Sequence, residues 1–245
     1  MAKFAVIIPA AGKGERFGGT EKKIFAKIDG RAVFLRSIEA FLNREDVCQT
    51  ILAIAPEDQD EMKSRYAANL GFMGVRLLIG GAERFETVAK ALEVVSEEAD
   101  YVAVHDAVRC CVSTEMIDAV FAAALKTQAA ILAAPLHGTI KRVSGANVIE
   151  ATVPREGLYE AQTPQVFKKA LLLEAYRRRA EFSGLPTDDS QLVEALGHPV
   201  SVVTSDFTNL KITTRADLTL AAAILKSRPK PKPSGPMGPF GEAQW

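Results

Sequence analysis

The chain has 245 residues, of which 48% are hydrophobic and 24% charged, and its 30 lysine and arginine residues balance 30 acidic residues. This composition is typical of a globular protein with a full core. A net charge of zero argues against nucleic acid as a partner, because proteins that bind nucleic acids carry a basic excess. Three cysteines are too few for a disulfide framework, and no apolar run reaches the roughly 20 residues that span a bilayer. We therefore expect a cytoplasmic protein that binds neither nucleic acid nor a membrane.

Short apolar runs alternate with segments of helical spacing through the first half of the chain. The predicted strands cover residues 4–9, 50–55, 75–79, 101–105 and 130–134. The predicted helices cover residues 33–42, 57–70, 83–95 and 114–125. Because continuous apolar runs indicate strands buried on both faces, this alternation predicts an α/β fold with a doubly wound, mostly parallel sheet. Such folds bind ligands at the carboxyl ends of their strands.

The pattern changes from Thr139 onward. Residues 139–143 and 148–153 alternate polar and apolar side chains on either side of a Ser-Gly-Ala-Asn sequence, which predicts a β-hairpin. A hairpin that stands out of an α/β core has exposed edges. We therefore expect an arm at about residues 137–157 that a second subunit covers.

Helices and strands return after the arm. Helices are predicted at residues 168–179 and 188–196 and up to about Lys226, and strands at residues 200–204 and near 209–212. Residues 228–245 are rich in proline and glycine, which predicts a disordered tail. We therefore expect a single domain over residues 1–227.

The segment after the first strand, residues 9–18, combines small residues with cations. Small residues here allow backbone N–H groups to approach a phosphate, and Arg16 and the Lys22-Lys23 pair would neutralise it. The dinucleotide-binding fingerprint fails because Phe17 stands where a third glycine is needed, and the P-loop sequence is absent. A tight glycine turn is the alternative interpretation. Three neighbouring cations, however, repel each other unless an anion lies among them.

Motifs in a fixed order resemble those of the sugar-phosphate nucleotidyltransferases. The motifs are Ala10-Ala11-Gly12-x-Gly14-x-Arg16-Phe17, Gly80-Gly81-x-Glu83-Arg84, His105-Asp106-Ala107-x-Arg109, Thr139-x-Lys141-Arg142, Thr163-Pro164-Gln165 and Asn209-x-Lys211-x-Thr213. More closely, the chain resembles the 2-C-methyl-D-erythritol 4-phosphate cytidylyltransferase family from about Phe4 to Leu225. The resemblance implies a Rossmann-like nucleotidyltransferase fold with a protruding β-hairpin arm.

Enzymes of this family join a nucleoside triphosphate to a polyol phosphate and release pyrophosphate. Because the attacking phosphate is already anionic, the reaction needs positioning and electrostatic stabilisation rather than a strong base. The resemblance implies that Arg16 and Lys23 stabilise the transition state, with Lys22 left open as the lysine in question. Two solvated surface cations are the ordinary alternative. The implied nucleotide-binding residues are Ala10, Ala11, Gly12, Gly14, Lys23, Gly81, Ala82, Arg84, Thr87, Asp106 and Ala107.

Asp106 ends the predicted strand 101–105, where a carboxylate would face a ligand. By resemblance it binds Mg²⁺, an ion that often takes only one or two protein carboxylates. An N-cap or turn aspartate is the alternative. His105 near Cys110 and Cys111 lacks the spacing of a zinc site, so we expect a buried histidine at the strand end.

The resemblance also implies a site for the polyol phosphate. Its residues are Asp106, Arg109, Thr139, Arg155, Thr163 and Lys211. Arg155 and Lys211 would position the acceptor for attack, with Arg155 supplied by the partner subunit of a homodimer. Two departures from the family pattern bear on nucleotide selectivity: Ala82 replaces a carboxylate and Cys110 replaces a proline.

Together these implications predict a Mg²⁺-dependent, homodimeric cytidylyltransferase that uses CTP and 2-C-methyl-D-erythritol 4-phosphate. Ribitol 5-phosphate is the alternative acceptor, because related enzymes share the same motifs. A non-catalytic nucleotide sensor would keep the pocket without turnover, and the retained cations argue against it. A dinucleotide-dependent oxidoreductase is a weaker alternative because of Phe17.

Overall fold

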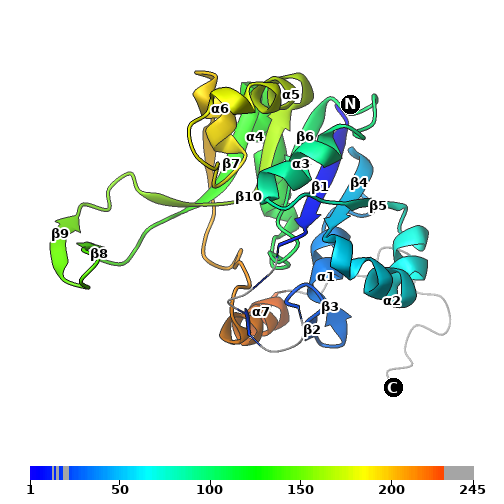
Figure 1. Ribbon diagram of the computed structural model, residues 1–245, viewed down its shortest axis with the longest axis horizontal. Coiled ribbons are helices and arrows are strands. Elements are labelled where there is room, and N and C mark those ends of the chain that lie inside the picture. Colours follow the sequence, from blue (N-terminus) through cyan, green and yellow to red (C-terminus); the bar gives the residue numbers. More distant parts are fainter. Residues whose placement is uncertain (13, 15–16, 19–21, 229–245) are drawn as a thin grey trace.

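A seven-stranded sheet forms the centre of the computed structural model, which describes residues 1–12, 14, 17–18 and 22–228 (Figure 1). In spatial order its strands are β11 (Ser201–Thr204), β7 (Ala129–Pro135), β10 (Tyr159–Lys168), β6 (Tyr101–Val104), β1 (Phe4–Ala10), β4 (Val47–Ile54) and β5 (Val75–Ile79). Neighbouring strands are parallel except at β10, which runs antiparallel to both β6 and β7. The predicted doubly wound, mostly parallel sheet is confirmed.

Helices cover both faces of this sheet. The helices are α1 (Val33–Glu39), α2 (Gln59–Phe72), α3 (Arg84–Leu92), α4 (Thr114–Thr127), α5 (Lys169–Arg177), α6 (Ser190–Ala195) and α7 (Arg215–Ser227). Val6 and Ile8 of β1 pack in the core formed with α1, α2, α4 and α7, whereas Ile7 packs in the core with α3, α5 and α6. Because successive side chains of a strand point to opposite faces, the continuous apolar run of β1 supplies both cores.

The central strands bring two predicted motifs to one edge of the sheet. β1 pairs in parallel with β6, with Ile7 opposite Val104, so both strands end at the same side. The loop that follows β1 and the residues that follow β6 therefore lie next to each other. Ligand sites of doubly wound folds form at this edge.

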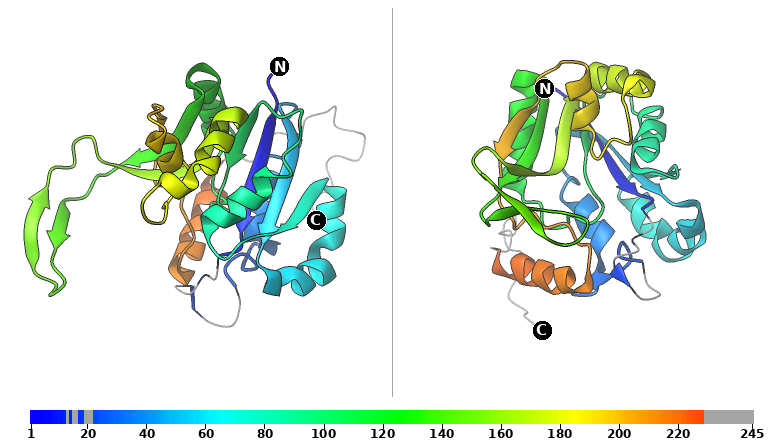
Figure 2. Two further views of the ribbon diagram at one scale, coloured as in Figure 1. Left: turned by 45° about the horizontal axis from the view of Figure 1, so that its top comes forward. Right: turned by 60° about the vertical axis from the view of Figure 1, so that its left-hand side comes forward.

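The predicted hairpin arm is confirmed. β8 (Ile140–Val143) and β9 (Ile149–Val153) pair only with each other in the described part of the chain and project away from the sheet (Figures 1 and 2). The arm starts from β7 and returns into β10, whose Tyr159 pairs with Pro135 at its base. Both strands of the arm are largely exposed, so neither has a core of its own.

Two expectations about the second half of the chain are wrong or incomplete. Residues 209–212 do not form a strand; the Ile212 N–H donates instead to the Val108 carbonyl oxygen in a loop. β10, by contrast, is a central strand for which no strand was predicted. Short elements complete the chain: β2 (Lys27–Ile28), β3 (Arg31–Ala32) and the 3₁₀ turns Pro56–Asp58 and Arg179–Glu181.

The end of the described chain is attached to the body. The Arg228 guanidinium donates to the carbonyl oxygens of Cys111 and Val112. The rest of the predicted tail, residues 229–245, lies outside the described residues. No helix in the described part of the chain combines the length and hydropathy needed to cross a bilayer.

Candidate functional site

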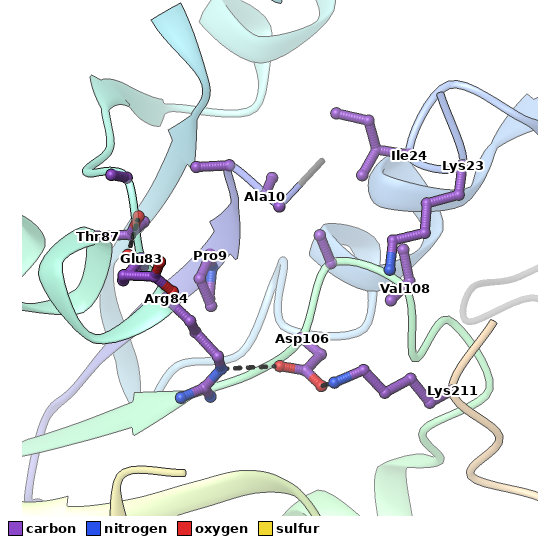
Figure 3. Close-up of a pocket in the computed structure, with 14 residues that line it drawn as sticks. Pro9, Ala10, Lys23, Ile24, Glu83, Arg84, Thr87, Asp106, Val108 and Lys211 are labelled. Atoms are coloured by element: carbon purple, nitrogen blue, oxygen red, sulfur yellow. Dashed lines mark hydrogen bonds and ion pairs between the residues drawn. The ribbon is translucent and has the colours of Figure 1, made fainter. Parts of the chain in front are cut away.

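A pocket opens where β1 and β6 end and α3 begins (Figure 3). It is lined by Pro9, Ala10, Ala11, Gly12, Lys23, Ile24, Ala82, Glu83, Arg84, Thr87, Asp106, Ala107, Val108 and Lys211. Small residues from the end of β1 form one wall, and charged side chains from four other segments line the space. The expected combination of a small-residue loop with cations is therefore present at the expected edge of the sheet.

Glycines allow the wall next to α3 to fold tightly. A Cβ on Gly80 would lie 2.8 Å from Thr87 Oγ1, and a Cβ on Gly81 would lie 2.4 Å from the Cβ of Glu86. No side chain fits there, so both positions require glycine. The Gly81 N–H donates to Thr87 Oγ1 at 3.0 Å. Thr87 thus faces the Gly80-Gly81 turn from inside α3.

The first turn of α3 is capped by two glutamate side chains, Glu83 and Glu86. Glu83 is the N-cap residue, and Glu86 accepts the backbone N–H groups of Ala82 and Glu83 at 2.9 and 3.1 Å. This reciprocal arrangement stabilises the helix start. The methyl group of Ala82 lines the pocket where the family pattern has a carboxylate, so the pocket has an apolar surface at that point.

Asp106 is the centre of charge in the pocket. Its carboxylate lies 2.7 Å from Lys211 Nζ, 3.4 Å from Arg84 Nε and 3.7 Å from Arg109 Nε. Burial disfavours the ionised carboxylate, but the positive charges of Arg84, Lys211 and Arg109 outweigh this effect and hold the pKa of Asp106 well below its usual range. Asp106 is therefore ionised, and three cations around one carboxylate leave positive charge for an anionic ligand.

His105 and Thr163 support Asp106 from behind. The Asp106 N–H donates to Thr163 Oγ1 at 3.0 Å, and Thr163 Oγ1 lies 3.2 Å from His105 Nδ1. His105 Nε2 lies 3.2 Å from the Arg109 carbonyl oxygen, which can only accept. Burial lowers the pKa of His105 to about 4, so the imidazole is neutral and carries its proton on Nε2. Both ring nitrogens serve this network, which makes His105 a structural strand-end residue.

A second pocket shares the charged centre with the first. Arg84, Asp106 and Lys211 line both, and the second is completed by Arg109, Ala161, Gln162, Thr163, Gln165, Thr187 and Asp188. Arg109 is buried and donates to the Asn209 carbonyl oxygen at 2.7 Å. Its Nε has no hydrogen-bond partner among the described residues. Because an unsatisfied buried donor is costly, this group is suited to an anion that enters the second pocket.

The two neighbouring lysines, Lys22 and Lys23, have different surroundings. Lys23 lines the first pocket and extends into it from the side opposite α3 (Figure 3). Lys22 points elsewhere: its Nζ lies 2.6 Å from Asp58 and 3.2 Å from Glu57. Burial opposes the charge of Lys22, but its hydrogen bonds to Asp58 and Glu57 raise its pKa. Of the two, Lys23 is the lysine that a ligand in the pocket would meet.

The predicted site residues fall into five groups. Ala10, Ala11, Gly12, Lys23, Ala82, Arg84, Thr87, Asp106, Ala107 and Lys211 line the first pocket, and Arg109 and Thr163 line the second. Gly14 and Gly81 line neither pocket; a Cβ on Gly14 would touch Lys23 at 3.4 Å, and Gly81 contacts Thr87. Thr139 and Arg155 lie on or beside the exposed arm. Arg16 lies outside the described residues.

Several residues near the charged centre were not predicted. Arg84 Nη1 lies 2.8 Å from the buried carboxylate of Asp189, which also accepts a hydrogen bond from Tyr176. Thr187 and Asp188 line the second pocket. The only signal in the sequence is the polar run Thr187-Asp188-Asp189-Ser190, which reads equally well as an ordinary helix start.

This arrangement suits the binding of two phosphate-bearing ligands that meet at Asp106. Cationic side chains line both pockets, and such groups stabilise charge on phosphate oxygens. Among the described residues, no cluster of three or more His, Cys, Asp or Glu side chains is arranged to hold a metal ion. A metal at Asp106 would therefore need most of its ligands from a bound phosphate and water.

Comparisons with known proteins agree with this geometry. The sequence model of the family 2-C-methyl-D-erythritol 4-phosphate cytidylyltransferase matches residues 4–227. The enzyme of that name from Rhodopirellula baltica is 43% identical over 235 residues, covering 91% of this chain and 95% of its own. The one from Endomicrobium trichonymphae is also 43% identical, over 226 residues, covering 92% of this chain and 100% of its own.

Solved structures of proteins with the same kind of name share the fold. The 4-diphosphocytidyl-2C-methyl-D-erythritol synthase from Anaerococcus prevotii superposes with a TM-score of 0.78 at 28% identity, over 92% of this chain and 96% of its own.

Proposed function

The chain belongs to the 2-C-methyl-D-erythritol 4-phosphate cytidylyltransferase family, and from this premise we propose how its residues perform that family's reaction. The protein is a nucleotidyltransferase. It converts CTP and 2-C-methyl-D-erythritol 4-phosphate to 4-diphosphocytidyl-2-C-methyl-D-erythritol and pyrophosphate, in non-mevalonate isoprenoid biosynthesis. The acceptor phosphate attacks the α-phosphorus of CTP in line with the departing pyrophosphate.

One observation carries the assignment of the residues: two pockets share Arg84, Asp106 and Lys211. CTP occupies the first pocket, where small residues of β1 and the start of α3 surround the nucleotide. The acceptor occupies the second, where Arg109 and Thr163 contact its phosphate. The two substrates then meet beside Asp106, so the enzyme gains most of its rate from their orientation.

Cations carry the electrostatic part of the reaction. Negative charge accumulates on the five-coordinate phosphorus, and Lys23 stabilises it from the side of the triphosphate. Arg16 is assigned the same role by the family motif, although it lies outside the described residues. Lys211 holds the acceptor phosphate, whose oxygen is already anionic and needs no base to attack.

Asp106 fits Mg²⁺ in its chemistry. The carboxylate is ionised, and both of its oxygens are used by cationic side chains that could exchange their contacts for a metal ion. Magnesium commonly binds one or two protein carboxylates together with substrate phosphates. Bound there with CTP, the ion would neutralise part of the triphosphate charge. Asp106 would hold it, while Lys211 and Arg84 shift their contacts to phosphate and to other acidic groups.

The arm completes the acceptor site in a homodimer. Arg155 and Thr139 are exposed, and they line neither pocket of their own chain. Val143, Val148 and Ile149 are large apolar side chains exposed on the arm. Exposed apolar residues on a two-stranded hairpin with open edges favour contact with another chain. In the dimer, Arg155 of one subunit reaches the acceptor phosphate bound to the other.

The proposed organisation is one domain over residues 1–227 with the arm at about 137–157, working in the cytoplasm. Cys48, Cys110 and Cys111 are all free thiols, which suits a reducing compartment. Cys110 is buried in the core cluster beside α1 and α4, so its replacement of a proline leaves the pocket surface unchanged.

The reaction is tested by pyrophosphate release from purified protein with CTP and Mg²⁺. 2-C-Methyl-D-erythritol 4-phosphate and ribitol 5-phosphate are supplied separately, each at the same concentration. Release with the methylerythritol phosphate alone is the expected result. Release with ribitol phosphate alone would overturn the acceptor but keep the mechanism, and CTP binding without release from either would indicate a nucleotide sensor.

A further inference from the structure

A buried carboxylate behind the pocket contacts the same arginine as Asp106. Asp189 directly precedes α6, and its side chain is fully buried. Its Oδ2 lies 2.8 Å from Arg84 Nη1, and its Oδ1 accepts a 2.5 Å hydrogen bond from the Tyr176 hydroxyl. Because a buried carboxylate is costly unless it is paired, Asp189 requires Arg84 to stay in this position.

Arg84 is shared unequally between two carboxylates. Its contact with Asp189 is 2.8 Å, whereas its Nε lies 3.4 Å from Asp106 Oδ1. Figure 3 shows one nitrogen of Arg84 turned toward Asp106 and the rest of the guanidinium turned away from it. The charges of Asp189 and Asp106 together keep the pKa of Arg84 above its usual value despite burial. Asp189 therefore both holds Arg84 and compensates its charge.

We propose that Asp189 is a positioning residue for cytidylyl transfer: by holding and neutralising Arg84, it leaves the Asp106 carboxylate available to the metal–CTP complex. The inference rests on the proposed function, in which Asp106 holds Mg²⁺. Without the charge of Asp189, Asp106 is the one ionic partner left to Arg84 among the described residues. The arginine then competes with the metal ion for the same oxygens.

The Thr163-Pro164-Gln165 motif sets the distance between the two carboxylates. Thr163 Oγ1 accepts the N–H of Asp106 at 3.0 Å. Gln165 Oε1 accepts the N–H groups of Asp189 and Ser190, both at 3.1 Å. One short segment of β10 thus fixes the backbone of both acidic residues on either side of Arg84. This gives the motif a role beyond its contact with the acceptor.

Tyr176 supports Asp189 from α5. Burial and the nearby charge of Asp189 raise the pKa of Tyr176 well above its ordinary value, so its hydroxyl stays protonated and donates. Removing this hydroxyl leaves the charge of Asp189 in place but takes away its hydrogen bond from Tyr176. The effect of Tyr176 on metal binding should therefore have the same direction as that of Asp189 and be smaller.

The test measures metal binding without turnover. Mn²⁺ is titrated into each protein with CTP present and no acceptor, and the free ion is followed by electron paramagnetic resonance. Asp189→Asn should weaken Mn²⁺ binding roughly tenfold, within the usual range for coupled sites, and Tyr176→Phe by about two- to threefold. In steady-state assays, the half-saturating Mg²⁺ concentration should rise in parallel while kcat at saturating Mg²⁺ stays within about twofold.

Matched controls separate this role from general damage to the fold. Asp46→Asn removes a carboxylate that pairs with Arg44 at 2.9 Å, and Tyr101→Phe removes a hydroxyl at the start of β6. Neither residue lines either of the two pockets of the site. Both should bind Mn²⁺ like the wild type. Asp189→Glu retains the charge and should recover most of the affinity.

Wild-type Mn²⁺ affinity in folded Asp189→Asn would overturn the proposal, and so would equal weakening in Asp46→Asn. Should Asp189→Asn fail to fold, unchanged Mn²⁺ binding in Tyr176→Phe would overturn it instead. These results are distinct from failure of the proposed function, which would be a wild-type protein that transfers the cytidylyl group to no acceptor.

Discussion

Asp106 in the pocket and Arg155 beside the arm are both assigned to the acceptor, but they are held in different ways. Asp106 is buried, contacts three cations of its own chain, and has its N–H bound by Thr163. Arg155 is exposed, and its side chain donates a hydrogen bond to the His137 carbonyl oxygen at the base of the arm. A single chain therefore fixes the pocket, whereas in the proposed homodimer a second chain gives the arm its working position.

This difference also separates two ways of losing activity. A change in the pocket removes a group that is already in place, so it should act on the rate of the chemical step. In the proposed homodimer, a change on the arm removes a group that acts only after assembly, so its effect should depend on which subunit carries it.

The largest effect should come from the pocket, with Lys23→Ala. Loss of this cation should reduce kcat by at least roughly 100-fold, the usual scale for one donor to a transition state. Lys22→Ala is the matched control and should lose far less, because Lys22 is paired with Asp58 at 2.6 Å. Both rates are measured by pyrophosphate release. Equal losses in the two variants would show that the pocket does not depend on Lys23 in particular.

The arm is tested by mixing subunits. Homodimers of Arg155→Ala and of Lys23→Ala should both be impaired, but their heterodimer should recover about half of the wild-type rate, since one of its two sites is intact. Purification through two different tags isolates the heterodimer. A heterodimer of Lys23→Ala with Lys211→Ala is the control and should stay inactive, because each pocket lacks one lysine. Recovery there, or none with Arg155→Ala, contradicts the shared site.

A smaller effect on stability should come from His105 behind the pocket. Its pKa is about 4 in the folded protein and 6.5 ordinarily, so the unfolded chain takes up the proton first as the pH falls. The free energy of unfolding should therefore be unaffected above about pH 6.5 and fall by about 3 kcal/mol between pH 6.5 and 4. Urea unfolding at several pH values measures this loss. The control variant His198→Gln changes an exposed histidine and should show the same loss of stability, whereas His105→Gln should not show it. A wild-type stability that does not change between pH 6.5 and 4 would contradict the argument from burial.

The first half of the fold could be predicted from sequence because its strands are continuous apolar runs. β10 was missed because residues 159–163 are largely polar and are followed by Pro164, features that argue against a central strand. Gln162, Thr163 and Gln165 are nonetheless buried there, since each has hydrogen-bond partners in the site. The strand predicted near residues 209–212 was wrong for the opposite reason. The sequence there resembles a strand, but buried Asn209 donates to Gln162 and Thr163 instead of pairing with a neighbouring strand.

The candidate site could be predicted where residues follow a strand end, as at Ala10 and Asp106. The motifs also indicated Lys211, but not that it lies in a loop. Spacing alone could not separate Lys22 from Lys23, because the answer depends on Asp58, more than 30 residues away in the sequence. Asp189 and Tyr176 were missed since neither local pattern nor composition indicates that a carboxylate of a polar run is fully buried.

The place of β10 in the sheet also sets the order in which the protein can be completed during synthesis. β1, β4, β5 and β6 pair with one another, so the ribosome delivers this half ready to associate. β7 follows β6 in the chain but joins it only through β10, which is made after the whole arm. A nascent chain that stops within the arm therefore has half a sheet and lacks Thr163. Because Lys211 lines both pockets, neither is complete until translation has passed it, which makes both substrates ligands of the finished chain and not of its folding intermediates.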